Sequence, residues 1–278
     1  MWPRDAFASL VLPTAVAGFL ILSSYSVIRA LHVYSLGLKQ AAGTLGSRSW
    51  IDQRIGSGGD AAYLIGTTLE PSIESQVLWQ NEFWNRSLRE VYGVNHSGLS
   101  LFSETLLRSE PNGSLVDPAG QQVRAPFVVA NLGFELDGRL IAAHPPLGLY
   151  RTRGPLHLAA ATTGISGDGW MGSYSSYSRY DRRSPPGKVL ISLSRASWTG
   201  PDVPGHVRIV RSAHGKQQVV ARWTIHSGAT RTFLVPVRRG PFVIGVTITP
   251  TFSPSTYGSP DTRQLGAQVS YRYRPSDG

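Results

Sequence analysis

Hydrophobic and polar residues alternate along the second half of the chain. In residues 188–194 (KVLISLS), Val189, Ile191 and Leu193 alternate with more polar neighbours, and residues 242–248 (FVIGVTI) follow the same two-residue period. Such a period is typical of a strand with one buried face. Helical periodicity is absent after Pro155, and apolar runs recur between Gly, Pro and Asp turns at 156–162, 188–194, 206–210, 217–225, 230–237, 242–249 and 267–273. This spacing predicts an antiparallel, jelly-roll-like β-sandwich over residues 154–278.

A mixed pattern in residues 60–153 predicts a small α/β domain. The run 61–66 (AAYLIG) suits a buried strand, and residues 73–92 follow with a helical period. Such a helix would place a ladder of ion pairs at i, i+4 and i+8, formed by Glu82, Arg86 and Glu90. Further strands are predicted at 99–107, 123–131, 134–141 and 147–151, with Asp137-Gly138 as the turn of a hairpin.

The first 35 residues contain the longest uncharged apolar run of the chain. Residues 6–28 (AFASLVLPTAVAGFLILSSYSVI) contain 23 positions without a formal charge, and a bilayer-spanning helix needs about 20. We therefore expect a transmembrane anchor within residues 1–35, then a juxtamembrane helix and linker over residues 36–59. A cleaved signal peptide is the alternative, since Ala15-Val16-Ala17 has the small-x-small form, but the apolar core of a signal is normally only about 7–15 residues long.

The charges that flank this segment favour a cytoplasmic body. Arg4 is offset by Asp5, whereas Arg29, Lys39 and Arg48 follow the apolar run. The positive-inside rule keeps the more basic side of a membrane helix in the cytoplasm. This orientation conflicts with the one that a family resemblance, described below, implies.

The chain is strongly basic, and the charge is concentrated in its second half. The 278 residues carry a formal net charge of +10, and residues 151–239 contain 14 Lys or Arg against three acids, a balance of +11. A bilayer-tethered domain with such a field attracts phospholipid headgroups, lipid-linked phosphates or acidic wall polymers. A solvated basic face without a partner is the alternative. Membrane tethering argues against nucleic acid as the partner.

Several kinds of active site are excluded by composition and motifs. The chain has no cysteine, and therefore no disulfide, thiolate zinc site or cysteine nucleophile. No GxSxG, HExxH, P-loop or EF-hand pattern occurs, and the seven histidines lack the spacing of metal ligands. The glycine-rich segment 56–61 (GSGGDA) precedes a strand instead of following one, which argues against dinucleotide binding. We therefore expect no catalytic residue, no metal site and no cofactor.

An aromatic stretch at residues 168–180 (DGWMGSYSSYSRY) is the strongest candidate for a binding site. Flat amphipathic rings beside hydroxyl groups suit the apolar face and the polar edge of a sugar. The same pattern suits a strand at the rim of a sheet, where the rings would be structural. If the stretch binds sugar, we expect the contacts to come from Trp170, Tyr174, Tyr177, Arg179 and Tyr180.

Three blocks of sequence resemble a known family. They are residues 77–87 (VLWQNEFWNRS) with Val91-Tyr92 after them, residues 168–170 (DGW) leading to 177–180 (YSRY), and residues 261–266 (DTRQLG). Together they resemble the C-terminal, extracytoplasmic region of actinobacterial polytopic glycosyltransferases that use lipid-linked sugars. The resemblance covers residues 50–273 and implies a small α/β unit, then a sandwich likened to carbohydrate-binding modules, outside the cytoplasm. That family's catalytic acid lies near its first membrane helices, and nothing in this sequence corresponds to that multi-helix core.

These observations support several hypotheses about function. The first is a non-catalytic, membrane-anchored extracytoplasmic module that binds or positions cell-envelope glycan or a lipid-linked sugar, as an accessory to a glycosyltransferase. In the second the chain is the C-terminal part of a polytopic glycosyltransferase, and in the third it is a scaffold of a membrane complex. A hydrolase without a recognised motif is a further alternative. The expected partners are membrane lipid, wall glycan or lipid-linked sugar, and a multi-helix membrane protein.

Overall fold

The computed structural model describes residues 48–66, 71–94, 104–131, 133–144, 147–166, 168–197, 203–213 and 215–276. The chain divides into two compact units, Met1–Gly46 and Ser47–Gly278, and all of the described residues belong to the second. The predicted anchor in residues 1–35 and the linker before residue 48 lie outside the described residues and stay predictions. Within the described ranges, no helix is long and apolar enough to cross a bilayer.

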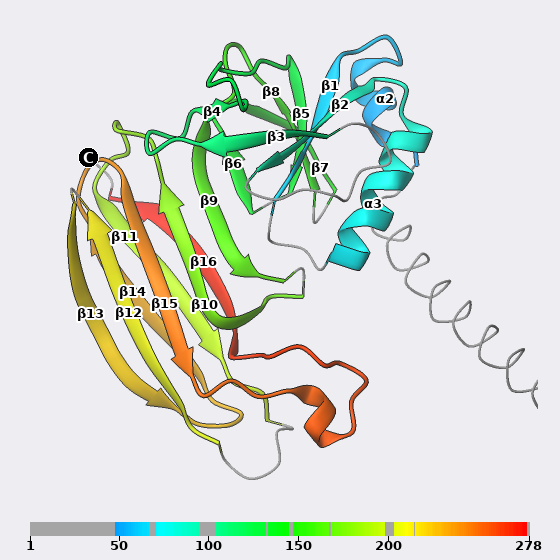
Figure 1. Ribbon diagram of the computed structural model, residues 1–278. Helices are drawn as coiled ribbons and strands as arrows, with labels where there is room; N and C mark the ends of the chain where they lie inside the picture. Colours follow the sequence, from blue (N-terminus) through cyan, green and yellow to red (C-terminus); the bar gives the residue numbers. More distant parts are fainter. Residues whose placement is uncertain are drawn as a thin grey trace, which may run out of the picture. The chain divides into compact units, whose positions relative to one another are not determined.

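The N-terminal part of the described chain is a seven-stranded mixed sheet with the strand order β4-β3-β2-β1-β5-β8-β7. The central strand β1 runs parallel to β2 and β5, and β2 runs parallel to β3, whereas the outer neighbours pair antiparallel. Figure 1 shows helices α2 and α3 lying against this sheet. The elements are α2 (Trp50–Ile55), β1 (Ala61–Ile65), α3 (Pro71–Trp84), β2 (Leu88–Val94), β3 (Glu104–Ser109), β4 (Leu115–Val116), β5 (Phe127–Asn131), β7 (Arg139–His144) and β8 (Leu147–Arg151).

Strand β1 is buried along its whole length, which explains its continuous apolar sequence AAYLI. Ala62 and Leu64 point into a core on one face of the sheet. A strand with both faces covered needs no alternation of polar and apolar residues. The strand predicted at 61–66 is confirmed, as are the strands predicted at 123–131 and 147–151, although β5 begins four residues late.

The helix predicted over residues 73–92 is wrong in its second half. Helix α3 ends at Trp84, and the chain turns and re-enters the sheet as β2. The predicted ladder of Glu82, Arg86 and Glu90 therefore does not form, because only Glu82 lies on the helix. The last four residues of β2 are buried in consecutive positions, as both-face burial in a sheet requires.

Helix α3 ends at Trp84 because side-chain hydrogen bonds between α2 and residues 85–87 stabilise a turn there. The Asp52 carboxylate of α2 accepts hydrogen bonds from the backbone N–H groups of Arg86 and Ser87, both at 2.9 Å, and from the Ser87 hydroxyl at 2.5 Å. The Asn85 side-chain oxygen accepts the N–H groups of Ile51 and Asp52 at 3.0 and 3.1 Å. The bonds to Asp52 satisfy N–H groups that a longer α3 would have paired internally, and the bonds to Asn85 satisfy free N–H groups in the first turn of α2.

The predicted hairpin within residues 134–141 is also wrong. Strand β6 (Phe134–Leu136) and strand β7 lie on either side of Asp137-Gly138, but they do not pair with each other. β7 joins β8 in the mixed sheet, whereas β6 pairs antiparallel with β9 of the second sheet. A turn dipeptide reverses the chain without deciding which strand each arm will join.

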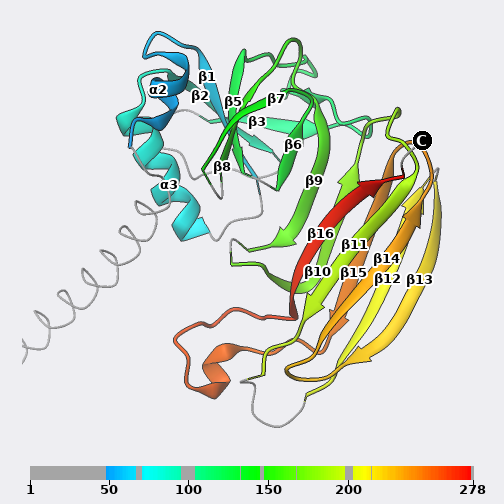
Figure 2. The same cartoon turned by 180° about the vertical axis from the view of Figure 1, so that it is seen from behind.

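The C-terminal part is a β-sandwich, as predicted. Its nine-stranded sheet has the order β13-β12-β15-β10-β16-β11-β14, with β9 beside β10 and β6 beside β9. In Figure 1 the strands β12, β13 and β15 lie in front of β11, β14 and β16, and Figure 2 shows this second group from behind. The strands are β9 (Leu158–Ile165), β10 (Trp170–Arg179), β11 (Gly187–Ser194), β12 (Gly205–Ala213), β13 (Lys216–Ile225), β14 (Thr230–Val237), β15 (Phe242–Thr249) and β16 (Ala267–Pro275).

The two groups of strands share one core. The inward residues of β11 and β15, which the alternation had identified, are 3% exposed or less. At the edge where β13 faces β14, Trp223 stacks on Phe233 with 3.8 Å between the ring centroids. At the other side β10 pairs with β15 and, at its beginning, with β16, so the two groups are joined there by backbone hydrogen bonds.

The two parts of the described chain share a core as well as a strand pairing. Phe134 and Leu136 of β6 and Leu158 of β9 pack with the inward residues of the mixed sheet. Residues Ser47–Gly278 accordingly cluster as one unit. The division at residues 153 and 154 therefore stays a prediction.

The bonds to Asp52 generate a prediction about pH. Burial would raise the pKa of the Asp52 carboxyl, but the hydrogen bonds from Ser87 and Arg86 outweigh burial and hold that pKa below its usual range. A carboxyl with a depressed folded-state pKa adds stability above its unfolded pKa, about 3.9, and loses it as the pH falls through the folded value. We expect the stability advantage of the native chain over Asp52→Asn to be full at pH 7 and to shrink from about pH 4 downwards.

Urea unfolding followed by tryptophan fluorescence across this pH range measures the difference. The matched control is Asp60→Asn, which removes an exposed carboxylate and should show no such trend. A gap between native and Asp52→Asn that stays constant from pH 7 to pH 2 would contradict the role assigned to the Asp52 carboxylate.

Candidate functional site

The residues predicted to bind sugar all lie on or directly after strand β10, but they do not form one site. The strand runs from Trp170 to Arg179, a length of about 30 Å at the usual rise of a strand. Met171 and Tyr177, at odd positions, are buried in the sandwich core, whereas Tyr174 is 50% exposed. Alternation thus divides the aromatic residues between the interior and the surface.

Tyr177 and its neighbours are part of the packing. Tyr177 is 4% exposed, and its ring stacks on Tyr271 with 5.9 Å between centroids. Burial, with a smaller contribution from Glu135, raises the pKa of Tyr177 to about 12. The Arg179 guanidinium lies over the Tyr273 ring at 4.5 Å.

Arg179 joins β10 to β6, and Tyr180 contacts the core of the mixed sheet. The Arg179 guanidinium forms an ion pair with Glu135 of β6 at 3.2 Å and donates to the Ser184 hydroxyl at 2.9 Å. Tyr180 packs against the core of the mixed sheet. Tyr177, Arg179 and Tyr180 therefore have structural contacts that account for them.

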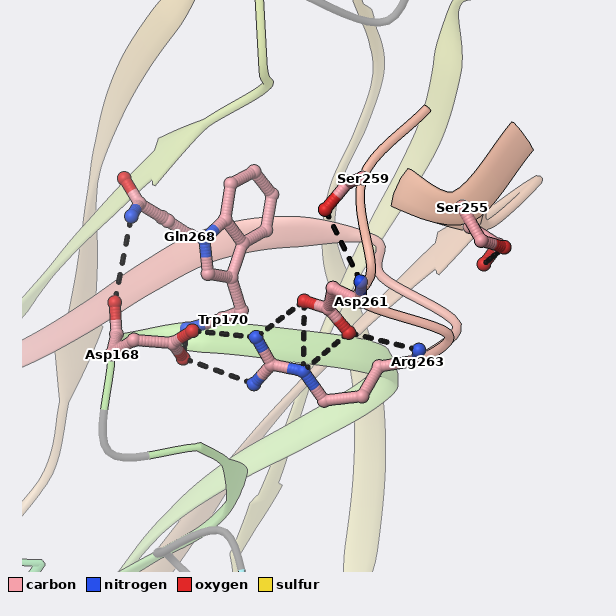
Figure 3. Close-up of polar contacts among 8 residues, drawn as sticks. Asp168, Trp170, Ser255, Ser259, Asp261, Arg263 and Gln268 are labelled. Carbon is pink, nitrogen blue, oxygen red and sulfur yellow. Dashed lines mark hydrogen bonds and ion pairs between the residues drawn. The ribbon is translucent and has the colours of Figure 1, made fainter. Parts of the chain in front are cut away.

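Trp170 lies at the opposite end of β10, beside a cluster of charged residues. The Arg263 guanidinium donates to Asp168 and to Asp261, each at 2.7 Å. Figure 3 shows Arg263 between the two carboxylates, with Trp170 and Gln268 beside them. The Trp170 ring packs edge-on against Phe252, with 5.9 Å between centroids.

This cluster joins two of the sequence blocks behind the family resemblance. Residues 168–170 lead into β10, residues 261–266 lie in the loop between β15 and β16, and Arg263 bridges the two blocks. The hydrogen bonds that Arg263 donates to Asp261 and to Asp168 raise the pKa of Arg263, and the bond from Arg263 lowers the pKa of Asp261. Because Arg263 is bonded to both Asp168 and Asp261, the cluster ties the loop at residues 261–266 to the start of β10. This is a structural role.

The exposed face of the sandwich carries a different set of residues. Tyr174 of β10 is paired with Thr247 of β15, Thr247 with Arg208 of β12, and Arg208 with Arg222 of β13. Residues opposite one another in an antiparallel pair project on the same side. These four side chains form a row across four strands, about 14 Å from end to end, which we call the outer row.

The Tyr174 ring lies flat enough on the sheet to cover a neighbouring glycine. A Cβ atom built on Gly245 would stand 3.2 Å from both the Cε2 atom and the hydroxyl oxygen of Tyr174. Gly245 belongs to β15, two residues before Thr247, so the ring reaches across the strand boundary. One side of the ring therefore rests on backbone, and half of the residue stays open to solvent.

The two arginines of the outer row are neither paired nor shielded. Among the described residues, neither guanidinium forms an ion pair or a hydrogen bond; the Thr247 hydroxyl donates to the backbone carbonyl of Arg208 at 3.3 Å. Residues 203–260 contain seven Lys or Arg and no acid. Like charges placed directly opposite on neighbouring strands are destabilising, so a carboxylate on this face would relieve the repulsion between Arg208 and Arg222. The row borders a shallow depression of about 440 Å³, lined by His206, Val207, Arg208, Arg222, Trp223, Thr224, Thr247 and Thr249.

Sequence reasoning found one member of the outer row, Tyr174, and missed the rest. The signal for Arg208, Arg222 and Thr247 was present in the alternation of β12, β13 and β15. However, the register that aligns them depends on pairings between strands far apart in the sequence.

No protein-family model matches the chain, and no curated protein matches it. Among solved structures, similarity is found to Xyl-CBM35 in complex with a glucuronic acid-containing disaccharide, at 12% identity, over 52% of this chain and 93% of that one, with a TM-score of 0.22. A family 35 carbohydrate-binding module from Clostridium thermocellum matches at 10% identity, over 52% and 88% of the two chains, with a TM-score of 0.22.

A xylan-binding domain of carbohydrate-binding module family 22 matches at 7% identity, over 53% of this chain and 85% of that one, with a TM-score of 0.24. TM-scores and identities this low carry no argument about this chain. Its architecture rests on the strand pairings given above.

The Arg263 cluster generates a prediction about local stability. Arg263→Gln removes both ion pairs, which are partly exposed and of the kind that contributes at most about 1 kcal/mol. We expect amide hydrogen exchange in residues 253–266 to accelerate roughly two- to fivefold, measured by mass spectrometry. Exchange in β11 should not change.

The matched control is Arg274→Gln, which removes an exposed arginine near the far end of β16. It should leave residues 253–266 unaffected. Unchanged exchange in that loop after Arg263→Gln would show that the ion pairs do not hold it closed.

Proposed function

We propose that the chain is a non-catalytic glycan-binding module and that the outer row is its binding face. The observation that carries the proposal is the half-exposed Tyr174 ring, supported by the Gly245 backbone and followed in line by Thr247, Arg208 and Arg222. An aromatic ring held flat on a sheet offers a platform for the apolar face of a sugar. The hydroxyl and guanidinium groups beside it suit the polar edges.

The remaining parts of the proposal come from the sequence. The apolar run at residues 6–28 supports a membrane anchor, and the resemblance to extracytoplasmic glycosyltransferase regions supports a jelly-roll-like sandwich that faces the cell envelope. In this proposal the module positions cell-envelope glycan or a lipid-linked sugar for a multi-helix glycosyltransferase. The same resemblance supports the second candidate, in which the chain is the C-terminal part of such an enzyme.

Glycan binding is tested by removing the aromatic platform. A glycan array with neutral and uronate-containing oligosaccharides identifies a ligand, and titration calorimetry then measures its affinity for the native chain and for Tyr174→Ala. We expect Tyr174→Ala to weaken binding about tenfold, since an aromatic contact with burial is worth about 1.4 kcal/mol or more. Thermal unfolding of this variant should change little, because the ring is half exposed.

Tyr257→Ala is the matched control, because Tyr257 is also exposed but lies on the 3₁₀ helix η1 (Pro254–Tyr257). It should bind the same oligosaccharide with native affinity. Equal affinities for the native chain and Tyr174→Ala, or no binding to any oligosaccharide on the array, would refute the proposal for this face.

The proposed location has its own test. Protease is added to intact, wall-permeabilised cells and, separately, to inside-out vesicles, and the fate of the body is followed with an antibody. We expect digestion in the cells and protection in the vesicles, since the proposal places the body outside the cytoplasm. The opposite pattern would agree with the flanking charges and reject an extracytoplasmic role.

A further inference from the structure

A second cavity opens at the end of the sandwich nearest the C-terminus. It has a volume of about 330 Å³ and is lined by Arg211, Ala213, Lys216, Gln218, Val237, Arg238 and Phe242. These residues come from the β12–β13 hairpin and from the turn between β14 and β15. Val237 pairs with Gly187, which pairs in turn with Pro275, so the cavity lies beside the last residues of β16.

Arg211 points into the sandwich, unlike the arginines of the outer row. Its partner on β15 is Ile244, which is fully buried. The Arg211 guanidinium donates through Nη1 to the Pro236 carbonyl oxygen at 2.6 Å and through Nη2 to the Gln218 side-chain oxygen at 2.5 Å. These two bonds reach from β12 to β14 and β13, and they fix the orientation of the guanidinium plane.

Three of the five N–H donors of the Arg211 guanidinium are not used by these two bonds. An arginine has N–H donors on all three nitrogens, including two on each terminal nitrogen. The two bonds to Pro236 and Gln218 use one donor on each terminal nitrogen. The Nε–H and one N–H on each terminal nitrogen remain, in the fork that binds phosphate or carboxylate oxygens in pairs.

The charge around this guanidinium is uncompensated. Arg211, Lys216 and Arg238 contribute three cations, and the other described lining residues are neutral. Both partners of the Arg211 guanidinium are neutral acceptors. A concave site with several cations concentrates multivalent anions.

The floor of the cavity is apolar. Phe242 is 3% exposed and Val237 is 4% exposed, so their side chains are part of the core wall. The volume falls at the lower end of the range for small-molecule sites, about 300–1,000 Å³. The cavity therefore combines a cationic rim with space for a small apolar group.

We propose that this cavity binds an organic phosphate, with Arg211, Lys216 and Arg238 around the phosphate group and Phe242 and Val237 against the organic part. This site is separate from the outer row, because Arg211 projects to the opposite side of β12 from Arg208. The chemistry is shared by soluble phosphate esters and by the headgroup of a lipid-linked phosphate. The choice between those two sources depends on whether the bound molecule also carries a lipid chain.

The test uses the full chain in a non-ionic detergent with phenyl phosphate and inorganic phosphate as probes. We expect saturable binding of phenyl phosphate, at least threefold tighter than inorganic phosphate because the ring contacts the apolar floor. Arg211→Gln and Lys216→Gln should each weaken binding about tenfold, the typical effect of losing a hydrogen bond between charged groups. Lys216 is exposed, so this variant tests the site without disturbing the core.

Arg239→Gln is the matched control, since Arg239 follows Arg238 directly but does not line the cavity. It should bind phenyl phosphate like the native chain. Equal weakening by Arg239→Gln and Lys216→Gln would mean that binding depends only on general charge attraction, and would overturn the proposal. Binding that does not saturate would overturn it as well. Competition by detergent micelles that contain polyprenyl phosphate, but not by micelles without it, identifies a lipid source; no competition by either kind of micelle identifies a soluble one.

Discussion

Strand β10 holds the architecture together, because it pairs with three other strands. It pairs with β15 over residues 174–179, with β9 along its other side, and with β16 at its first two residues. Through β9 it reaches β6 and the core of the mixed sheet, and through β16 it reaches the second group of sandwich strands. A shift of β10 by one residue would exchange its inward and outward side chains and break all of these contacts at once.

This dependence explains how an aromatic segment can contain both structural and exposed rings. Tyr177 packs in the core between Phe242 and Tyr271. Tyr174 is an odd number of residues away along the strand, so its side chain projects from the outer face. The same rule on β12 separates Arg208, which faces solvent, from Arg211, which faces the interior. Strand register therefore distributes the basic residues between the outer face of the sheet and the cavity at the end of the sandwich.

Much of the fold follows from local sequence. The strands at 230–237 and 242–249 were predicted with their observed bounds, because alternation and turn residues agree there. The wrong predictions share one cause: contacts with residues far away in the sequence decide the structure there. Residues 85–92 have a helical period, yet Asp52 and Asn85 bind the turn at 85–87 through contacts that span more than 30 residues. The hairpin at 134–141 failed because β9 pairs with β6, and no residue within 134–141 encodes that choice.

The candidate site shows the same limit more sharply. Trp170, Tyr174, Tyr177 and Tyr180 are spaced by four, three and three residues, a spacing that would gather them on one face of a helix. On a strand only an even spacing keeps two residues on one face. Tyr177 is three residues from Tyr174, so the two side chains project from opposite faces. The outer row and the cationic cavity are then on opposite sides of β12, because Arg208 and Arg211 are three positions apart. Because the two sites project from opposite faces of the sheet and share no residue, we expect them to respond independently to substitution.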